Sequence, residues 1–152
     1  MYQRILVPID GSETATRGLG EAIKLAENQG ASIRLVHIVD EMILLSADAS
    51  GANIASVLEM LRTGGEALLA AAEADVRRAG VEVDAKLIEA MGEPAGGYIV
   101  QQATDWPADL IVCGTHGRRG IRRIVMGSDA EFIIRHTPVP VLVLRSHEPS
   151  SE

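Results

Sequence analysis

Apolar positions along the chain follow two alternating patterns, short continuous runs and helical stripes. The short runs, of which residues 4–9 are the first, are typical of strands buried in a sheet. We expect strands at residues 4–9, 32–39, 81–88, 109–113 and 139–144. Apolar residues at helical spacing between these runs predict helices at residues 13–29, 54–79, 94–104 and 129–136. The order βαβαβαβαβ predicts an α/β fold with a parallel sheet covered by helices on both faces.

Residues that favour helix ends mark several boundaries. Ser12 is expected to cap the first helix, and Gly30 to follow its end. Pro94 suits the first turn of the third helix, and Ser128 is expected to cap the fourth. Residues 40–53 follow neither pattern and receive no assignment.

Length and composition limit the class of protein. The 152 residues suit one domain, in which we expect residues 1–146 to fold and 147–152 to form a short polar tail. A single cysteine excludes a disulfide framework and fits a reducing compartment. No apolar run approaches the ~20 residues that span a bilayer, and the N-terminus lacks the pattern of a signal peptide. We therefore expect a cytoplasmic protein with no membrane partner.

Charge is unevenly distributed along the chain. The net charge of −7 argues against a nucleic-acid partner. Residues 114–128 nevertheless contain four arginines, at 118, 119, 122 and 123, and no acidic residue. This basic segment indicates either a local anion site or a solvated arginine face, and charge alone does not decide between them.

A glycine-rich segment follows the fourth predicted strand. Gly114, Gly117 and Gly120 lie at three-residue spacing, and Gly127 and Ser128 open the last helix. Glycines let backbone N–H groups approach an oxyanion, and a helix N-terminus adds free N–H groups with partial positive charge. The spacing matches neither a Walker A loop nor the dinucleotide-binding GxGxxG. The segment is therefore either a phosphate site of a third type or an ordinary strand-to-helix turn.

The loop after the first strand contains a carboxylate at Asp10. Such a carboxylate could bind ribose hydroxyls, or hold Mg²⁺ through water. The alternative is a turn aspartate that supports the first helix. If the first and fourth strands are neighbours, Asp10 faces the glycine segment across the crevice where ligands bind in open parallel sheets.

Several motifs together resemble one family. They are the spacing Gly114-x2-Gly117-x9-Gly127-Ser128 and the stretches ILVPIDGS, LVHIV, DLIVCGTHGRRG and TPVPVLVLR. They span essentially the whole chain and resemble the ATP-binding members of the universal stress protein family. The resemblance implies a single-domain, open parallel sheet of the adenine nucleotide alpha hydrolase type. Its five strands would follow the order 3-2-1-4-5, with helices on both faces.

The resemblance implies two groups of nucleotide-binding residues. The residues implied for the nucleoside are Pro8, Ile9, Asp10, Val39, Gly114 and Thr115. Among them, Asp10 would hold the ribose and Val39 would line the adenine pocket. The residues implied for the phosphates are Gly117, Arg118, Gly127, Ser128, Asp129 and Ala130, the last two through their backbone amides.

Two of these positions depart from the family pattern. Asp129 stands where the family usually has an apolar residue, and Ala130 lacks a hydroxyl that some members offer. A carboxylate suits the first turn of a helix. It would repel a nearby phosphate unless it points away or a cation intervenes.

The resemblance implies a protein that binds ATP or a related adenine nucleotide and regulates a stress response. The cofactor is therefore ATP or another adenine nucleotide, with Mg²⁺ as a candidate ion at Asp10. No general base is evident near the glycine segment, because Asp10 is expected at the ribose, so we expect no catalytic residue and at most slow hydrolysis. The alternatives are an interaction module of the same family that binds no nucleotide, and a true hydrolase or phosphotransferase.

The resemblance also implies a homodimer through the last strand, residues 139–144, besides an unknown protein partner. Alternate apolar positions on an edge strand favour such pairing. The other interpretation is that this strand is simply buried within its own sheet.

The remaining residues of interest have simpler interpretations. We expect His37 to be a satisfied core residue and His136 to lie at a helix C-terminus. Cys113 is interpreted as a small buried hydrophobic residue, and Trp106 as a packing residue. His116 either touches phosphate or packs on its neighbours.

Overall fold

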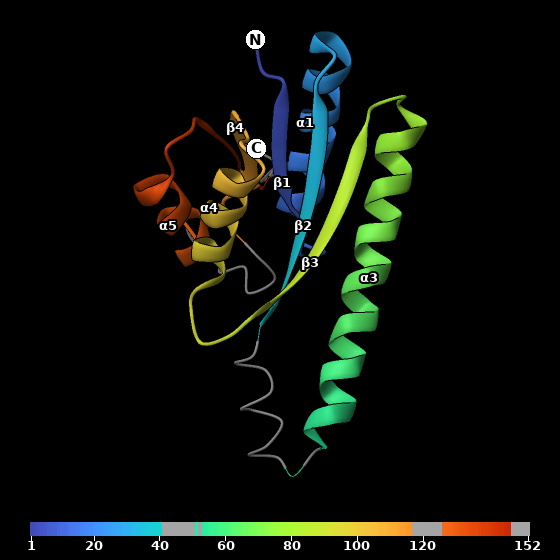
Figure 1. The fold of residues 1–152 in the computed structure, drawn as a ribbon, viewed down its shortest axis with the longest axis vertical. Coiled ribbons are helices and arrows are strands. Elements are labelled where there is room, and N and C mark those ends of the chain that lie inside the picture. Colours follow the sequence, from blue (N-terminus) through green and yellow to red (C-terminus); the bar gives the residue numbers. More distant parts are fainter. Residues whose placement is uncertain (41–50, 52, 117–125, 147–152) are drawn as a thin grey trace, which may run out of the picture.

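The central strand of the sheet is buried on both faces. This strand, β1 (Arg4–Pro8), carries three fully buried residues, Ile5, Leu6 and Val7. The structure is a computed structural model, and it describes residues 1–40, 51, 53–116 and 126–146 (Figure 1). Because successive side chains point to opposite faces, these three buried residues require cover on both sides of the sheet, which the helices provide.

Strands and helices alternate along the described part of the chain. After β1 come α1 (Glu13–Gln29), β2 (Ser32–Asp40), α3 (Ile54–Arg78), β3 (Val83–Ala90), α4 (Ala95–Asp105), β4 (Leu110–Gly114), α5 (Ser128–His136) and β5 (Val141–Leu144). The five strands described form a parallel sheet in the order β3-β2-β1-β4-β5. The predicted α/β class and the strand order 3-2-1-4-5 are confirmed.

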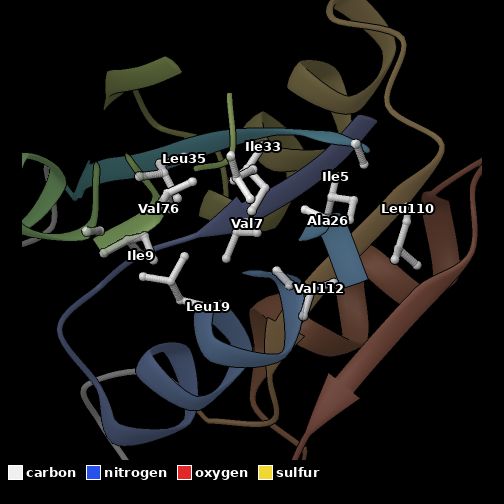
Figure 2. Packing of buried hydrophobic residues seen from close by; sticks show 14 of the residues in the cluster. Ile5, Val7, Ile9, Leu19, Ala26, Ile33, Leu35, Val76, Leu110 and Val112 are labelled. Atoms are coloured by element: carbon white, nitrogen blue, oxygen red, sulfur yellow. The ribbon is translucent and has the colours of Figure 1, made fainter. Parts of the chain in front are cut away.

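The helices form two layers, one on each face of the sheet (Figure 1). Because side chains alternate along a strand, Ile5 and Val7 point to the face covered by α1 and α3. There they join a core that includes Leu19 of α1 and Val76 of α3 (Figure 2). Leu6 points to the opposite face, into a second core that α4 and α5 complete.

The observed helix ends agree with the sequence at α1 and differ elsewhere. Ser12 caps α1 through a hydrogen bond that its Oγ accepts, and Gly30 follows with φ of +67°, as predicted. The prediction for α5 is wrong, because Gly127 is the N-cap residue and Ser128 is the first helical residue. Pro94 lies just outside α4, at the N-cap, instead of in its first turn.

Two strands begin later than the apolar pattern predicts. β3 begins at residue 83 instead of 81, and β5 at residue 141 instead of 139. Before β5, the Thr137 hydroxyl donates to the Val139 carbonyl and accepts from the Val139 amide, at 3.3 and 3.2 Å. The local turn therefore occupies backbone groups that the pattern had assigned to the strand. The predicted tail at 147–152 lies outside the described residues, as do 41–50 and 52 of the unassigned segment.

Three of the simpler side-chain predictions are confirmed. Cys113 is buried in the core beneath α4 and α5, and burial raises the pKa of its thiol to about 11. Trp106 packs partly buried against the same core, with the Arg34 guanidinium 4.9 Å from the centre of its ring. His136 is the last residue of α5.

Helix α3 comes very close to the sheet at Gly65. A Cβ atom built there would lie 2.5 Å from Cδ2 of His37 and 2.9 Å from Cδ1 of Leu87. Gly64, one residue earlier, has no atom within 4 Å of an added Cβ. Only the second glycine of this pair is therefore required by packing.

The two glycines predict opposite effects of the same substitution. Gly65→Ala should lower the free energy of unfolding by about 1–3 kcal/mol, because overpacking displaces His37 and Leu87. Gly64→Ala should raise it by up to about 1 kcal/mol, the difference in helix propensity. Urea denaturation of both variants measures the difference. Equal stabilisation of both variants would contradict the close approach at Gly65.

Candidate functional site

The candidate site lies where the chain reverses its order of strand addition. β1 pairs with β2 on one side, and with β4 on the other at Ile5↔Leu110 and Leu6↔Ile111. β1 and β4 are parallel neighbours, so the loops that follow them lie next to each other at the carboxyl ends of the strands. Crevices at such switch points are the usual ligand sites of open parallel sheets. The expectation that the first and fourth strands, which precede Asp10 and the glycine segment, are neighbours is confirmed.

The loop after β1 is a tight, internally bonded turn. The amide of Ser12 donates to Oδ1 of Asp10 at 2.9 Å, and Gly11 between them has φ of +81°. The turn interpretation of Asp10 is therefore confirmed for one of its carboxylate oxygens. Its ribose and Mg²⁺ roles stay predictions. Pro8 ends β1 immediately before this turn, where no ladder hydrogen bond is needed.

Both backbone groups of Ile9 are held by β2. Its amide donates to the Val36 carbonyl at 2.8 Å. Its carbonyl accepts from Nδ1 of His37 at 2.7 Å, so Nδ1 carries the ring proton. His37 is the satisfied core residue that the sequence predicts. Its contact with a predicted nucleotide residue is a role that sequence reasoning missed, since nothing local relates positions 9 and 37.

Val39 extends past the end of β1. Pro8 is in register with Val36, so the last residues of β2 continue beyond the central strand toward the crevice edge. Val39 is buried there, and its place in an adenine pocket stays a prediction. Its register partner on β3 is Glu89.

Glu89 forms an ion pair with Arg62 of α3. The hydrogen bond from the guanidinium lowers the pKa of the Glu89 carboxyl, and it raises the pKa of Arg62. No local pattern in the sequence predicts this pair, because its members lie on different elements. The ion pair places two charges near the carboxyl end of β3, at the same end of the sheet as the candidate site.

A hydrogen bond joins the two ends of the loop after β4. The amide of Gly127 donates to the Thr115 carbonyl at 2.6 Å, and the Thr115 amide donates to the Leu144 carbonyl at 2.8 Å. The start of the glycine segment is therefore joined directly to the residue that opens α5. Gly117 and Arg118, which the resemblance assigned to the phosphates, lie outside the described residues.

His116 is partly buried beside Thr115. Its Nδ1 lies 2.9 Å from the Thr115 hydroxyl, and its Nε2 is buried with no hydrogen-bond partner among the described residues. The packed interpretation of His116 is therefore confirmed for one ring nitrogen. A phosphate contact stays a prediction.

The N-cap residue of α5 provides no side-chain cap. Gly127 occupies the N-cap position, and no side chain bonds to the first-turn amides from there. The amides of Ser128, Asp129 and Ala130 are the first-turn donors of this helix, where the helix dipole is positive. The Ala130 methyl is buried in the core, so only its backbone is available to a ligand.

The Asp129 side chain is engaged with a different helix. Its Oδ1 accepts a hydrogen bond from the Gly96 amide at 3.1 Å, in the first turn of α4. α4 receives no cap from its own N-cap residue, Pro94. Asp129 therefore caps α4 from α5, and one of its carboxylate oxygens is directed to that helix. A carboxylate that points away is the first of the two conditions, given above, under which a phosphate could bind beside Asp129.

Metal-binding clusters and membrane-spanning helices were both sought in the described part of the chain. No group of three or more His, Cys, Asp or Glu side chains there could hold a metal ion. None of the helices described is long and apolar enough to cross a bilayer. A surface hollow of about 450 Å³ lies between the C-terminal ends of α1 and α3, away from both loops of the candidate site.

The fold identifies the class of protein: an open parallel α/β protein whose strand order switches between β1 and β4. Proteins of this class usually bind their ligands at that switch point. A family model described as the universal stress protein family matches residues 1–145. The chain therefore belongs to the universal stress protein family.

Known relatives agree with this assignment. Universal stress protein MJ0531 of Methanocaldococcus jannaschii is 32% identical over 145 residues, which are 95% of this chain and 83% of that protein. The solved structure of hypothetical protein MJ0577, reported as a structure-based assignment of biochemical function, has a TM-score of 0.84 at 25% identity. That match covers 98% of this chain and 99% of the other.

Two further solved structures contain adenine nucleotides. A universal stress protein from Archaeoglobus fulgidus in complex with dAMP has a TM-score of 0.66 at 24% identity, covering 94% of this chain and 98% of that one. A universal stress protein in complex with cAMP has a TM-score of 0.67 at 20% identity, covering 95% and 97% of the two chains. Both share the fold with this chain.

The contact between Asp129 and Gly96 predicts a stability effect. Asp129→Ala removes the acceptor of the α4 amide and should lower the free energy of unfolding by about 1 kcal/mol, the usual cost of a lost helix cap. Asp129→Asn keeps an acceptor oxygen and should retain most of that stability. Urea denaturation distinguishes the two variants. A loss of equal size in both would contradict the hydrogen bond as the source of the effect.

Proposed function

We propose that this protein binds an adenine nucleotide, ATP first, in the crevice between the loops after β1 and β4, and that it regulates a stress response. One observation carries the proposal. The first turn of α5, which receives no side-chain cap from its N-cap residue, is joined by the Gly127–Thr115 hydrogen bond to the end of β4, so its amides adjoin the switch point. Amides at a helix N-terminus are suited to phosphate oxygens. The dAMP and cAMP complexes are consistent with this use of the fold.

In this proposal the residues of the crevice divide between nucleoside and phosphates. Pro8, Ile9 and Asp10 would contact the adenine and ribose, with the free oxygen of Asp10 on a ribose hydroxyl or on a water of Mg²⁺. Val39 would line the adenine pocket. The backbone of Gly114 and Thr115 would lie beneath the nucleoside.

The phosphate end would use backbone amides and one hydroxyl. Gly127 and Ser128, with the amides of Asp129 and Ala130, would bind the β- and γ-phosphates. The fit is supported by the side chain of Asp129, which is held on the Gly96 amide. Its negative charge is thereby partly offset by the N-terminus of α4.

We expect hydrolysis to be at most slow, so nucleotide binding and not catalysis would be the function. A general base must reach the attacking water in a suitable geometry. Of the two crevice carboxylates described, Asp10 supports its own turn and Asp129 caps α4. We propose the cytoplasm as its compartment, since the single cysteine fits a reducing environment.

The second candidate is an interaction module of the same family that binds no nucleotide. The negative charge of Asp129 in the first turn of α5, where the phosphates would bind, is the observation that favours it. This candidate and the first differ in a single measurable property, the affinity for nucleotide.

Calorimetric titration with ATP, with and without Mg²⁺, tests the proposal. We expect micromolar or tighter binding, or co-purified adenine nucleotide on denaturing extraction. Ser128→Ala should weaken binding by roughly five- to tenfold, the effect of one lost hydrogen bond. Ser32→Ala, at the opposite end of the sheet, should leave binding unchanged. A folded protein that neither binds ATP nor carries nucleotide would favour the interaction module.

We also propose that the protein forms a homodimer through residues 139–144. β5 is an edge strand of the described sheet, and none of its four residues is fully buried. Leu142 is 38% exposed on that strand. An edge strand with exposed apolar side chains is a template for pairing with a second chain. These observations disfavour the interpretation that β5 is simply buried within its own sheet.

A lysine at Leu142 tests the dimer. We expect wild-type protein to sediment as a dimer at micromolar concentration and Leu142→Lys as a monomer, because the strand edge would carry two like charges at the two-fold interface. Met91→Lys is the control, since Met91 is exposed beyond β3 at the other edge of the sheet. A monomeric wild type, or a dimer unaffected by Leu142→Lys, would contradict the proposal.

A further inference from the structure

Thr14, in the first turn of α1, is a polar side chain buried between the two loops of the crevice. It is 4% exposed, although helix first turns are commonly solvated. Its hydroxyl donates to the carbonyl of His116, 102 residues away in the chain. This bond crosses from the first turn of α1 to the loop after β4.

The Thr14 hydroxyl also lies at one end of a short series of hydrogen bonds. The amide of Ala15 donates to Oγ of Ser12 at 3.2 Å, and Oγ of Ser12 lies 3.4 Å from Oγ1 of Thr14. Because the Thr14 proton is used on the His116 carbonyl, Ser12 donates in the contact between the two hydroxyls. The residue that caps α1 is thereby connected to the loop after β4.

Packing at Gly114 fixes the same contact from the other side. A Cβ atom at Gly114 would lie 2.3 Å from Oγ1 and 2.6 Å from Cβ of Thr14. The first glycine of the glycine segment is therefore explained by the space that Thr14 occupies. Thr14 thus contacts Gly114 by packing and His116 by a hydrogen bond.

We infer that Thr14 is a positioning residue for the candidate nucleotide site: its hydroxyl fixes Gly114–His116 against α1, and so sets the place of Gly127 and the α5 amides that would bind phosphate. The inference rests on the proposed function for its ligand. The connection to α5 runs through the Gly127 amide, which donates to the carbonyl of Thr115, between the two residues that Thr14 contacts. Thr14 itself need not touch the nucleotide.

Removal of the Thr14 hydroxyl distinguishes a positioning role from a general effect on the stability of the protein. Thr14→Val keeps the shape and removes the donor, and we expect it to weaken ATP binding by roughly five- to tenfold. Adenosine, measured by competition against ATP, should be weakened less than ATP, because both ligands share the contact with the Gly114 and Thr115 backbone, whereas only ATP has phosphates to align with the α5 amides. Thr14→Ser keeps the donor and should restore ATP affinity to within about twofold. Thr14→Ala takes the place of the valine variant if the latter does not fold.

Thr16→Val is the matched control on the same helix. Thr16 is exposed, and its hydroxyl donates to the Ser12 carbonyl at the start of the same helix. We expect no change in ATP affinity. Equal weakening of ATP and adenosine by Thr14→Val, or an equal effect of Thr16→Val, would overturn the inference, since either result indicates a general structural effect.

Amide hydrogen exchange tests the positioning without any ligand. Thr14→Val should speed exchange of the Thr115 and Gly127 amides, whose bonds depend on the fixed loop, and leave the amides in the middle of α1 unchanged. If wild-type protein binds no nucleotide, the proposed function fails, and the exchange result alone decides the role of Thr14. Unchanged exchange at Thr115 and Gly127 would overturn the inference in either case.

Discussion

The burial of β1 on both faces is the constraint on which the rest of the structure depends. Ile5 and Val7 require one helical layer and Leu6 requires another, so the chain must cross the sheet on both sides. Right-handed crossovers on opposite faces then add strands in opposite directions from β1. The switch point at the end of β1 follows from this arrangement, and so does the crevice. The burial of three adjacent hydrophobic residues thereby determines where a ligand could bind.

The crevice is held together by contacts between residues that are far apart in the sequence. His37 fixes the Ile9 carbonyl, Thr14 fixes the loop after β4, and Asp129 fixes α5 on α4. Glycine at 65 and 114 makes two of these contacts possible, because a side chain at either position would occupy the space of His37 or Thr14. A loop held in this way loses little conformational freedom when a ligand binds, and so retains more of the interaction energy as affinity.

Much of the fold could be predicted from the sequence, because it depends on local patterns. Apolar runs and helical stripes identified every element described, and Ser12 and Gly30 marked the ends of α1 correctly. The errors have local causes too. Ser128 was expected to cap α5, but Gly127 precedes it with a suitable extended backbone. Strand β5 begins late because Thr137 closes a turn on Val139.

The candidate site was predictable only in its location. Asp10, Gly114 and Gly127 were found from their places at strand and helix ends, which are local properties. The contacts of Thr14 and His37 join positions 102 and 28 residues apart, and no pattern within a helix or strand reveals them. Asp129 illustrates the difference most clearly. In the sequence it is a negative charge beside a predicted phosphate site, whereas in the structure its carboxylate satisfies an amide of a helix whose own N-cap residue is proline. The effect of a charged residue on a binding site therefore depends on the partner that the fold provides for it.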